Sequence, residues 1–204
     1  NPGAARSTVR SPIVFYLDRG TPEPVRGALL DGARWWADAF DAAGFIDAFR
    51  VELAPEGMDL ADVRYNAITW THRATRGWSY GGGIVDPRSG EILKGYVNLG
   101  SQRVRQDLLI AEGILAPYKP GADPALRNEA QQMALQRLKQ LAAHEVGHAL
   151  GFAHNFAASR APTGSVLDYP HPQINLAADG QPRMPTAYDS GVGKWDKFVV
   201  AHAY

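Results

Sequence analysis

Apolar residues fall into short runs in the first half of the chain and follow helical spacing in much of the second half. Runs of roughly four to eight apolar or alternating residues, bounded by turn residues, are typical of β-strands. A joint rich in Gly, Pro and Asp between two such runs is typical of a hairpin. The pattern predicts strands at 13–17, 49–53, 66–70, 81–85 and 92–99, with a hairpin joining the last two.

Apolar positions three and four residues apart predict helices. The expected starts carry a capping side chain, in two cases followed by proline, and glycine marks two of the expected ends. The predicted helices run from Thr21 to Gly44, from Ser101 to about Ala116, from Asp123 to Gly151, and from Asp189 and Ser190 towards the C-terminus. Trp35 and Trp36 in the first helix are expected to pack in the core.

The order of strand, helix, strand and strand predicts a twisted, mainly parallel sheet with helices packed on it. A chain of 204 residues is long enough for one domain with a full core. We therefore expect an α+β fold with long helices and one hairpin. After residue 151 the chain is rich in Pro and Gly and lacks periodicity until its last helix.

The stretch LAAHEVGHALGFAHN, residues 141–155, carries the candidate chemistry. His144 and His148 are four residues apart, so on a helix their imidazoles project from one face and provide half of a tetrahedral zinc site. Glu145 lies roughly 100° round the helix from His144. There it reaches a water on the metal more easily than the metal itself, which is the place for a general base.

Two further residues extend this motif. Gly151 permits a positive φ, so the helix can stop and the chain can turn sharply. His154 then returns as a third metal ligand. An apolar stripe on the same helix can face the sheet while the imidazoles face a cleft. The stripe consists of Leu135, Leu138, Ala142, Val146 and Ala149.

The complete motif, H-E-x-x-H-x-x-G-x-x-H, resembles the signature of the metzincin clan of zinc endopeptidases, in which a Met-turn follows downstream. The downstream element is SVLDYP at 165–170, where Leu167 replaces the clan's methionine. With WSYGG at 78–82 and DPRSGEI at 86–92, the sequence is similar to a branch of large bacterial zinc metalloproteases, from about Ile13 to Tyr204. Leu and Met exchange in cores for less than about 1.5 kcal/mol, so Leu167 should still form a floor beneath the imidazoles.

This resemblance implies a single catalytic domain of two lobes, an upper lobe of residues 1–151 and a lower lobe of residues 152–204. It also implies that the first hairpin strand is an antiparallel edge strand at the rim of the cleft, along which substrate lies as an added strand. The rim residues are Gly81, Gly82, Gly83 and Ile84. Their glycines are equally consistent with close backbone approach and with a flexible loop.

Tyr169 lies two residues after Leu167. In some metzincins a tyrosine at this place binds the zinc or swings away to stabilise the transition state. We carry that role over to Tyr169, beside the alternative that it is a packed residue with its hydroxyl bonded to backbone. Asp168 is expected to anchor the turn through hydrogen bonds.

Three histidines without cysteine fit one catalytic zinc ion that keeps a position open for water. The predicted reaction is hydrolysis of internal bonds of a peptide or protein, with Glu145 passing the water proton to the departing amine. Two alternatives stay open, a peptide-binding module that has lost catalysis and a zinc protease whose third ligand is a distant Glu. Glu145 argues against the first, and Gly151 with His154 argues against the second.

Composition narrows the choice of partners. Lys plus Arg and Asp plus Glu each total 21, so charge gives no reason to expect nucleic acid or an anionic membrane. The chain has no cysteine, which excludes thiolate chemistry. No apolar run approaches the ~20 residues that a membrane crossing needs.

The chain begins at Asn1, without an initiator Met or a signal peptide. We therefore expect an excised or processed piece of a protein. The resemblance implies flanking domains in the full-length protein and a secreted, periplasmic or cell-surface location. His72, His171 and His202 have no partners at ligand spacing and are expected to be surface or structural residues.

Overall fold

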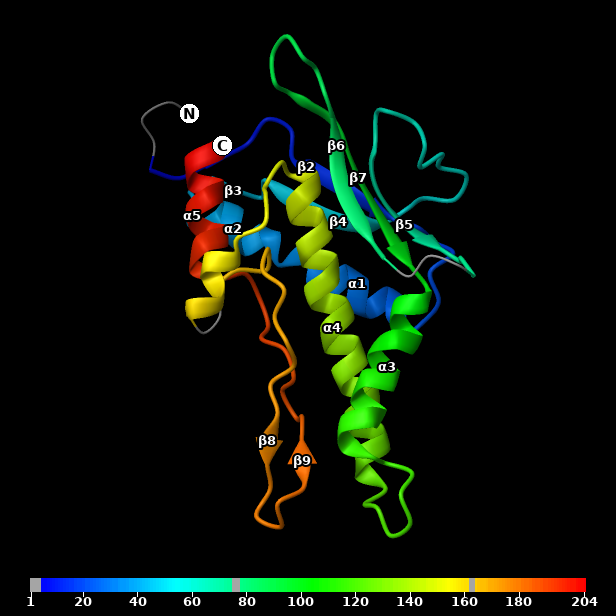
Figure 1. Cartoon of the computed structure of the whole chain (residues 1–204). Coiled ribbons are helices and arrows are strands. Elements are labelled where there is room, and N and C mark those ends of the chain that lie inside the picture. The colour runs from blue at the N-terminus through cyan, green and yellow to red at the C-terminus, as the bar shows by residue number, and fades with distance from the viewer. Residues whose placement is uncertain (1–4, 75–77, 162–163) are drawn as a thin grey trace.

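The computed structural model describes residues 5–74, 78–161 and 164–204, which form a β-sheet with helices packed against it (Figure 1). The strands are β1 (Ser7–Thr8), β2 (Ile13–Leu17), β3 (Phe45–Ile46), β4 (Phe49–Leu53), β5 (Asn66–Thr71), β6 (Tyr80–Val85), β7 (Ile92–Gly100), β8 (Asn175–Leu176) and β9 (Pro182–Arg183). The helices are α1 (Val25–Arg34), α2 (Trp36–Ala42), α3 (Gln102–Leu115), α4 (Ala125–Ala149), the short 3-10 helix η1 (Phe156–Arg160) and α5 (Lys194–Ala203).

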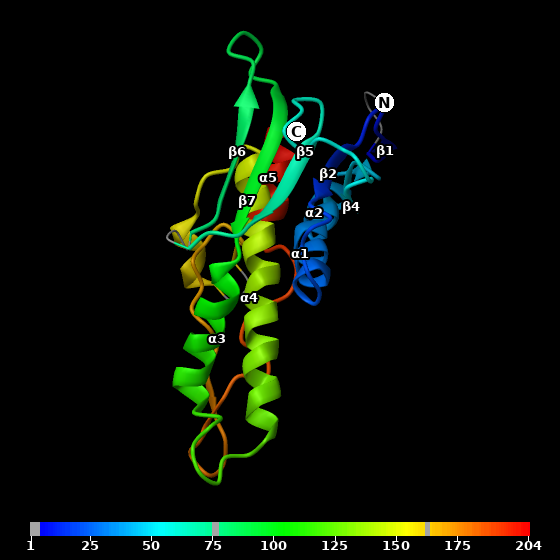
Figure 2. The same ribbon diagram turned by 90° about the vertical axis from the view of Figure 1, so that its right-hand side faces the viewer.

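The main sheet has the strand order β4-β2-β5-β7-β6. The first four strands are mutually parallel, and β6 pairs antiparallel with β7 at the edge. A mainly parallel sheet with one antiparallel strand and a C-terminal helix confirms the α+β fold expected from the sequence. In Figure 2 the helices α1 and α4 run side by side next to the sheet, and α4 contacts β6 and β7.

The long helix α4 supplies the centre of the core. Leu138, Ala142, Val146 and Ala149, four of the five residues of the predicted stripe, are buried against the sheet and α1. Trp36 is fully buried, and its indole N–H donates a 2.7 Å hydrogen bond to the Ala143 carbonyl of α4. The apolar face of α4 is thus fixed, which sets the direction of its polar face.

Gly32 brings the backbone of α1 directly onto α4. A Cβ atom at this position would lie 2.0 Å from the carbonyl oxygen of Lys139, far inside any real contact. The two helices therefore cross with no side chain between them at this point. The interaxial distance at the crossing depends on the glycine.

The predicted first helix is two helices. Thr21 does not cap it, because its hydroxyl is buried without a hydrogen-bond partner in the described part of the chain and α1 begins only at Val25. The chain breaks at Trp35, between α1 and α2. Two adjacent indoles cannot point in one direction from a helix, and here Trp36 enters the core while Trp35 stays half-buried.

Helix starts elsewhere show one success and two corrections. Asp123 accepts the N–H of Ala125 at 2.9 Å, which confirms the predicted start of α4. Ser101 makes no capping hydrogen bond at α3. The expected cap at Asp189 and Ser190 is also wrong, because α5 begins only at Lys194.

The ends of α3 and α4 project below the sheet, beside the two-stranded β8–β9 hairpin (Figure 1). A second, smaller core fills this region. Its buried members are Ala111, Leu115, Leu126, Ala130, Met133, Met184, Ala187 and Tyr188. None of the helices in the described ranges combines the length and the apolar character that crossing a membrane requires.

We predict that Gly32→Ala destabilises the protein, since the new methyl group forces α1 away from α4. The expected loss is about 1–3 kcal/mol of unfolding free energy, as for other overpacked sites. Gly113→Ala is the matched control: this glycine is exposed within α3 and a Cβ there meets nothing within 4 Å. The control variant should gain roughly 0.5–1 kcal/mol of unfolding free energy. Equal melting temperatures for the two variants would contradict the close crossing.

A second prediction concerns Asp107, which is buried on α3. One of its oxygens has no partner in the described ranges, and the other lies 3.4 Å from Arg103. Burial raises its pKa, so the folded state binds the proton more tightly than the unfolded state does. Relative to Asp107→Asn, the wild type should lose stability as pH rises from about 4, near the unfolded pKa. Urea unfolding at pH 4 to 7 measures this difference, and a pH-independent difference would disprove it.

Candidate metal centre

Three imidazoles converge at the end of α4. His144 and His148 project from the helix, and Gly151, with φ +93°, turns the chain just after it. The turn closes with a 3.0 Å hydrogen bond from Phe152 N–H to the Gly147 carbonyl. It returns His154 to the other two rings, so that the Nε2 atoms lie 3.1, 3.1 and 3.3 Å apart.

Backbone carbonyls fix the tautomers of two of these rings. Nδ1 of His144 lies 2.8 Å from the Val166 carbonyl, and Nδ1 of His148 lies 2.7 Å from the Phe152 carbonyl. Each Nδ1 must therefore carry the proton, which leaves each Nε2 as a bare lone pair. Burial lowers the pKa of His144 to about 4, so that ring is neutral near pH 7. Two lone pairs facing each other at 3.1 Å repel unless a cation lies between them.

This donor set fits a tetrahedral zinc ion. With Zn–N bonds of ~2.0–2.1 Å, two ligand atoms of a tetrahedron lie about 3.3–3.4 Å apart. The observed separations of 3.1 to 3.3 Å are close to that value. Neutral imidazoles whose second nitrogen donates to a carbonyl are typical zinc ligands.

The comparisons with known proteins agree with this geometry. Residues 127–204, which include all three histidines, match the family model described as Met-zincin. This part of the chain, fewer than half of its residues, is similar to the Met-zincin family. The match supports zinc as the metal that the three histidines could hold. No curated protein matches the sequence.

Solved structures resemble the chain at low identity. A structure of myroilysin has 15% identical residues over 98% of this chain and 95% of that chain, with a TM-score of 0.44. A second myroilysin structure has 15% identity, coverage of 99% and 86%, and a TM-score of 0.45. Archaemetzincin from Methanopyrus kandleri has 14% identity, coverage of 83% and 84%, and a TM-score of 0.33.

Glu145, which lies in the matched segment, is buried next to the triad. Its carboxylate accepts a hydrogen bond from the Gly81 N–H of β6, and Arg137 and Arg103 contribute positive charge. Burial outweighs these effects and raises the pKa of Glu145 to about 7. The side chain is thus held by a backbone donor of the sheet.

The rim residues lie in a strand and do not form a flexible loop. Gly81, Gly82 and Gly83 are all part of β6, whose outer edge pairs with no other strand of the described residues. A Cβ at Gly81 would lie 1.9 Å from the Glu145 carbonyl oxygen. The close backbone approach is therefore to α4, and it places the edge strand against the helix that carries the triad. Ile84 is 46% exposed further along the strand.

The turn at 165–170 lies beneath the imidazoles. Leu167 is completely buried, and its carbonyl accepts the Asn155 N–H at 3.0 Å. A Cβ at Gly147 of α4 would lie 2.7 Å from Leu167 Cδ2, so the leucine packs tightly under the helix. Asp168 anchors the turn by accepting hydrogen bonds from the Ser159 hydroxyl and the Tyr169 N–H.

Tyr169 reaches the triad directly. Its hydroxyl lies 2.7 Å from Nε2 of His154, and its ring packs on the same imidazole with centroids 4.8 Å apart. The ring is 57% exposed, so nothing encloses it on the solvent side. The tyrosine hydroxyl thus contacts a histidine of the triad, where the alternative reading expected a bond to backbone.

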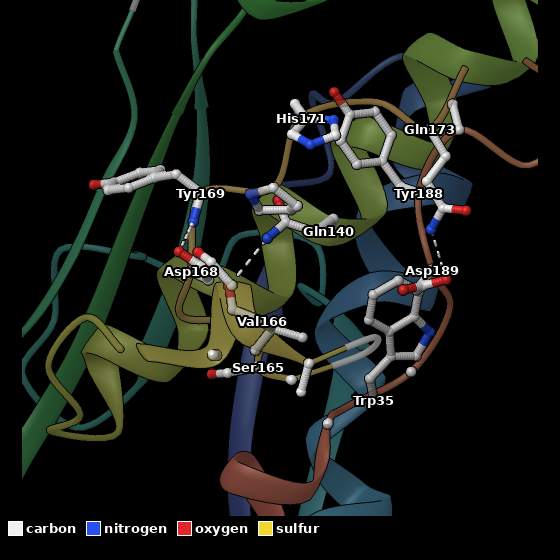
Figure 3. A pocket seen from close by; sticks show the side chains of 18 residues that line it. Trp35, Gln140, Ser165, Val166, Asp168, Tyr169, His171, Gln173, Tyr188 and Asp189 are labelled. Atoms are coloured by element: carbon white, nitrogen blue, oxygen red, sulfur yellow. Dashed lines mark hydrogen bonds between the residues drawn. The ribbon is translucent and has the colours of Figure 1, made fainter. Parts of the chain in front are cut away.

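The remaining histidines lie away from the triad. His72 stands edge-on to Trp70, and His202 stacks on Phe198 in α5. His171 lines a cavity next to the turn (Figure 3).

Asp196 of α5 is a functional residue that sequence reasoning missed. It is fully buried and accepts hydrogen bonds from Ser165 Oγ, Val166 N–H and Gly193 N–H at 2.6, 2.9 and 2.6 Å. Gln140 donates to the Val166 carbonyl at 3.0 Å, beside the bond from His144 (Figure 3). Asp196 therefore holds the turn whose carbonyl orients His144. Since it lies 30 residues after the turn, no local spacing signals the contact.

We predict that Asp196→Asn weakens zinc binding as well as folding. The amide would face two backbone N–H donors with a donor of its own, and an unsatisfied buried group costs about 1–3 kcal/mol. Competition with a chromophoric chelator should show at least tenfold weaker zinc affinity. The control is Asp47→Asn, the same change at an exposed residue with φ +53°, which asparagine adopts readily. Unchanged zinc affinity in a folded Asp196→Asn protein would contradict a role for Asp196 in supporting the metal site.

Proposed function

We propose that the chain is a zinc-dependent endopeptidase that hydrolyses internal peptide bonds. The observation that carries this proposal is the convergence of three imidazole nitrogens, 3.1 to 3.3 Å apart, next to a buried carboxylate that an edge strand holds. A structural zinc site would need a fourth protein ligand. The described residues bring no fourth His, Cys or acidic ligand to this cluster.

Zinc bound there would act as a Lewis acid that polarises the scissile carbonyl and acidifies a water molecule. The protein's own contribution begins with orientation. The carbonyls of Val166 and Phe152 hold the rings of His144 and His148 in the tautomer that presents Nε2. Because these acceptors are backbone atoms, the orientation persists when side chains rearrange.

Glu145 is the proposed general base. It follows His144 on α4 and is restrained by the Gly81 N–H, so its carboxylate is positioned before substrate arrives. It would take a proton from the attacking water and deliver that proton to the departing amine. Tyr169 is proposed to stabilise the transition state through its exposed hydroxyl, which lies at the triad.

Substrate is proposed to bind along β6 as an added antiparallel strand. The outer edge of β6 pairs with no other strand in the described ranges, so it offers the backbone N–H and C=O groups of every second residue to an added strand. The cleft would lie between an upper lobe of residues 1–151 and a lower lobe of residues 152–204. We further propose that the natural protein carries flanking domains and acts outside the cytoplasm, on proteins it meets there.

We predict that Glu145→Gln keeps zinc but loses hydrolysis. General acid–base groups contribute about 10²–10⁴ in rate, and glutamine keeps the size and the hydrogen-bond acceptor of Glu145. Zinc content measured on the purified chain should be unchanged. Cleavage of a denatured protein, followed by mass spectrometry, should fall at least 100-fold, and chelation should abolish cleavage by the wild type.

Other results lead to other functions. Bound zinc with no cleavage by either wild type or Glu145→Gln would favour a peptide-binding module. His154→Ala should lose most of its zinc. If that variant retains zinc at wild-type affinity, the third ligand is elsewhere, as in the distant-Glu class of zinc proteases.

A further inference from the structure

A cavity of about 240 Å³ lies beside the turn at 165–170 (Figure 3). Its walls include five separate parts of the chain: the α1–α2 junction with Trp35, α4 with Gln140, η1 with Ser159, the turn itself, and the segment after β9 with Tyr188 and Asp189. Pockets for whole small ligands measure about 300–1,000 Å³. This one is smaller and suits a single side chain.

The cavity adjoins the triad through two shared residues. Val166 lines it and also accepts the hydrogen bond from His144 Nδ1. Tyr169 lines it and also contacts Nε2 of His154 through its hydroxyl. A peptide held at the triad would therefore bring a side chain next to the scissile bond into the cavity.

Its charge is negative, although the whole chain is neutral. The lining contains two carboxylates, Asp168 and Asp189, and no Lys or Arg. Asp168 is bound within the turn, whereas Asp189 is exposed and has one oxygen 3.1 Å from the Gln173 amide. Arg137 lies against the Tyr188 ring, 5.6 Å from its centroid, but donates to Gln140 and interacts with Asp107 on α3. Asp189 is thus the carboxylate open to a ligand.

Aromatic rings surround that carboxylate. The indole of Trp35 lies beside Asp189, and the rings of Tyr188 and His171 stand across from it (Figure 3). Aromatic faces pack well on the methylene stems of long side chains and attract cations, tryptophan most strongly. An apolar side chain would leave Asp189 without a counter-charge. A lysine or arginine side chain can pack its stem on the rings and pair its positive charge with Asp189.

We propose that this cavity binds a lysine or arginine side chain of the substrate, next to the scissile bond, with Asp189 as its counter-charge and Trp35 as its aromatic wall. The proposal rests on the proposed endopeptidase function and names its substrate class. It gives Trp35 a role that its neighbour Trp36, completely buried, cannot share.

The test compares two peptides that differ in one residue, lysine or norleucine, which has a similar stem without the ammonium group. We expect the zinc-loaded wild type to cleave the lysine peptide with at least tenfold higher kcat/KM. Mapping the cuts in a denatured protein should place Lys or Arg beside most of them. Asp189→Asn retains the hydrogen-bond acceptor for Gln173. It should bring the ratio of kcat/KM for the lysine peptide to kcat/KM for the norleucine peptide close to one.

The control is Glu56→Gln, which removes one negative charge from an exposed loop residue outside the cavity and should leave the ratio unchanged. Cleavage without preference for lysine, or a ratio that Asp189→Asn does not alter, would overturn the cavity assignment and leave the endopeptidase standing.

If the wild type cleaves neither peptide, the endopeptidase proposal fails. The affinity for the two peptides then tests the cavity assignment separately. Calorimetric titration of the zinc-loaded wild type should then show at least tenfold tighter binding of the lysine peptide. Equal affinity for the two peptides would overturn the assignment. Tighter binding that Asp189→Asn abolishes would support it for a binding module.

Discussion

The hydrogen bond from His144 to the Val166 carbonyl connects the two halves of the site. On one side it sets the tautomer and direction of a ring on α4. On the other it depends on a turn that Asp196 holds from α5 and that Gln140 holds from α4. Hydrogen bonds thus join Gln140, His144 and Asp196 to the same residue, Val166. Backbone carbonyls orient His144 and His148, whereas the exposed His154 contacts the other two rings and the Tyr169 hydroxyl.

A second constraint acts on α4 itself. Its backbone is approached directly from two sides, by α1 at Gly32 and by β6 at Gly81. At both places even a methyl group is too large, so neither neighbour can shift without breaking contact. Because Gly81 also donates to Glu145, the sheet edge and the carboxylate keep a constant relation. Small residues here act as precise spacers, which is the opposite of the flexibility that glycine usually suggests.

Much of the fold follows from local pattern. The five main strands and the buried stripe of α4 were predictable because burial repeats with a fixed period along each element. His144 and His148 were predictable from helix spacing, and His154 from the turn that a glycine with positive φ permits at Gly151. The break at Trp35, the contact of Gly81 with α4 and the buried Asp196 were not predictable. Each is decided by a partner at least 30 residues away, which leaves no periodic trace. The ligand and base roles, and the two-lobe division, stay predictions.

The open edge of β6 has a consequence for selectivity. Main-chain hydrogen bonds are the same for every amino acid except proline, so an edge strand binds an extended chain independently of its sequence. Such a surface would accept almost any unfolded polypeptide, including a neighbouring copy of itself. Selectivity among substrates must then come from contacts with their side chains and not with their backbone amides. If substrate binds as proposed, selectivity would come from the cavity beside the turn at 165–170, while the edge of β6 would only align the bound chain.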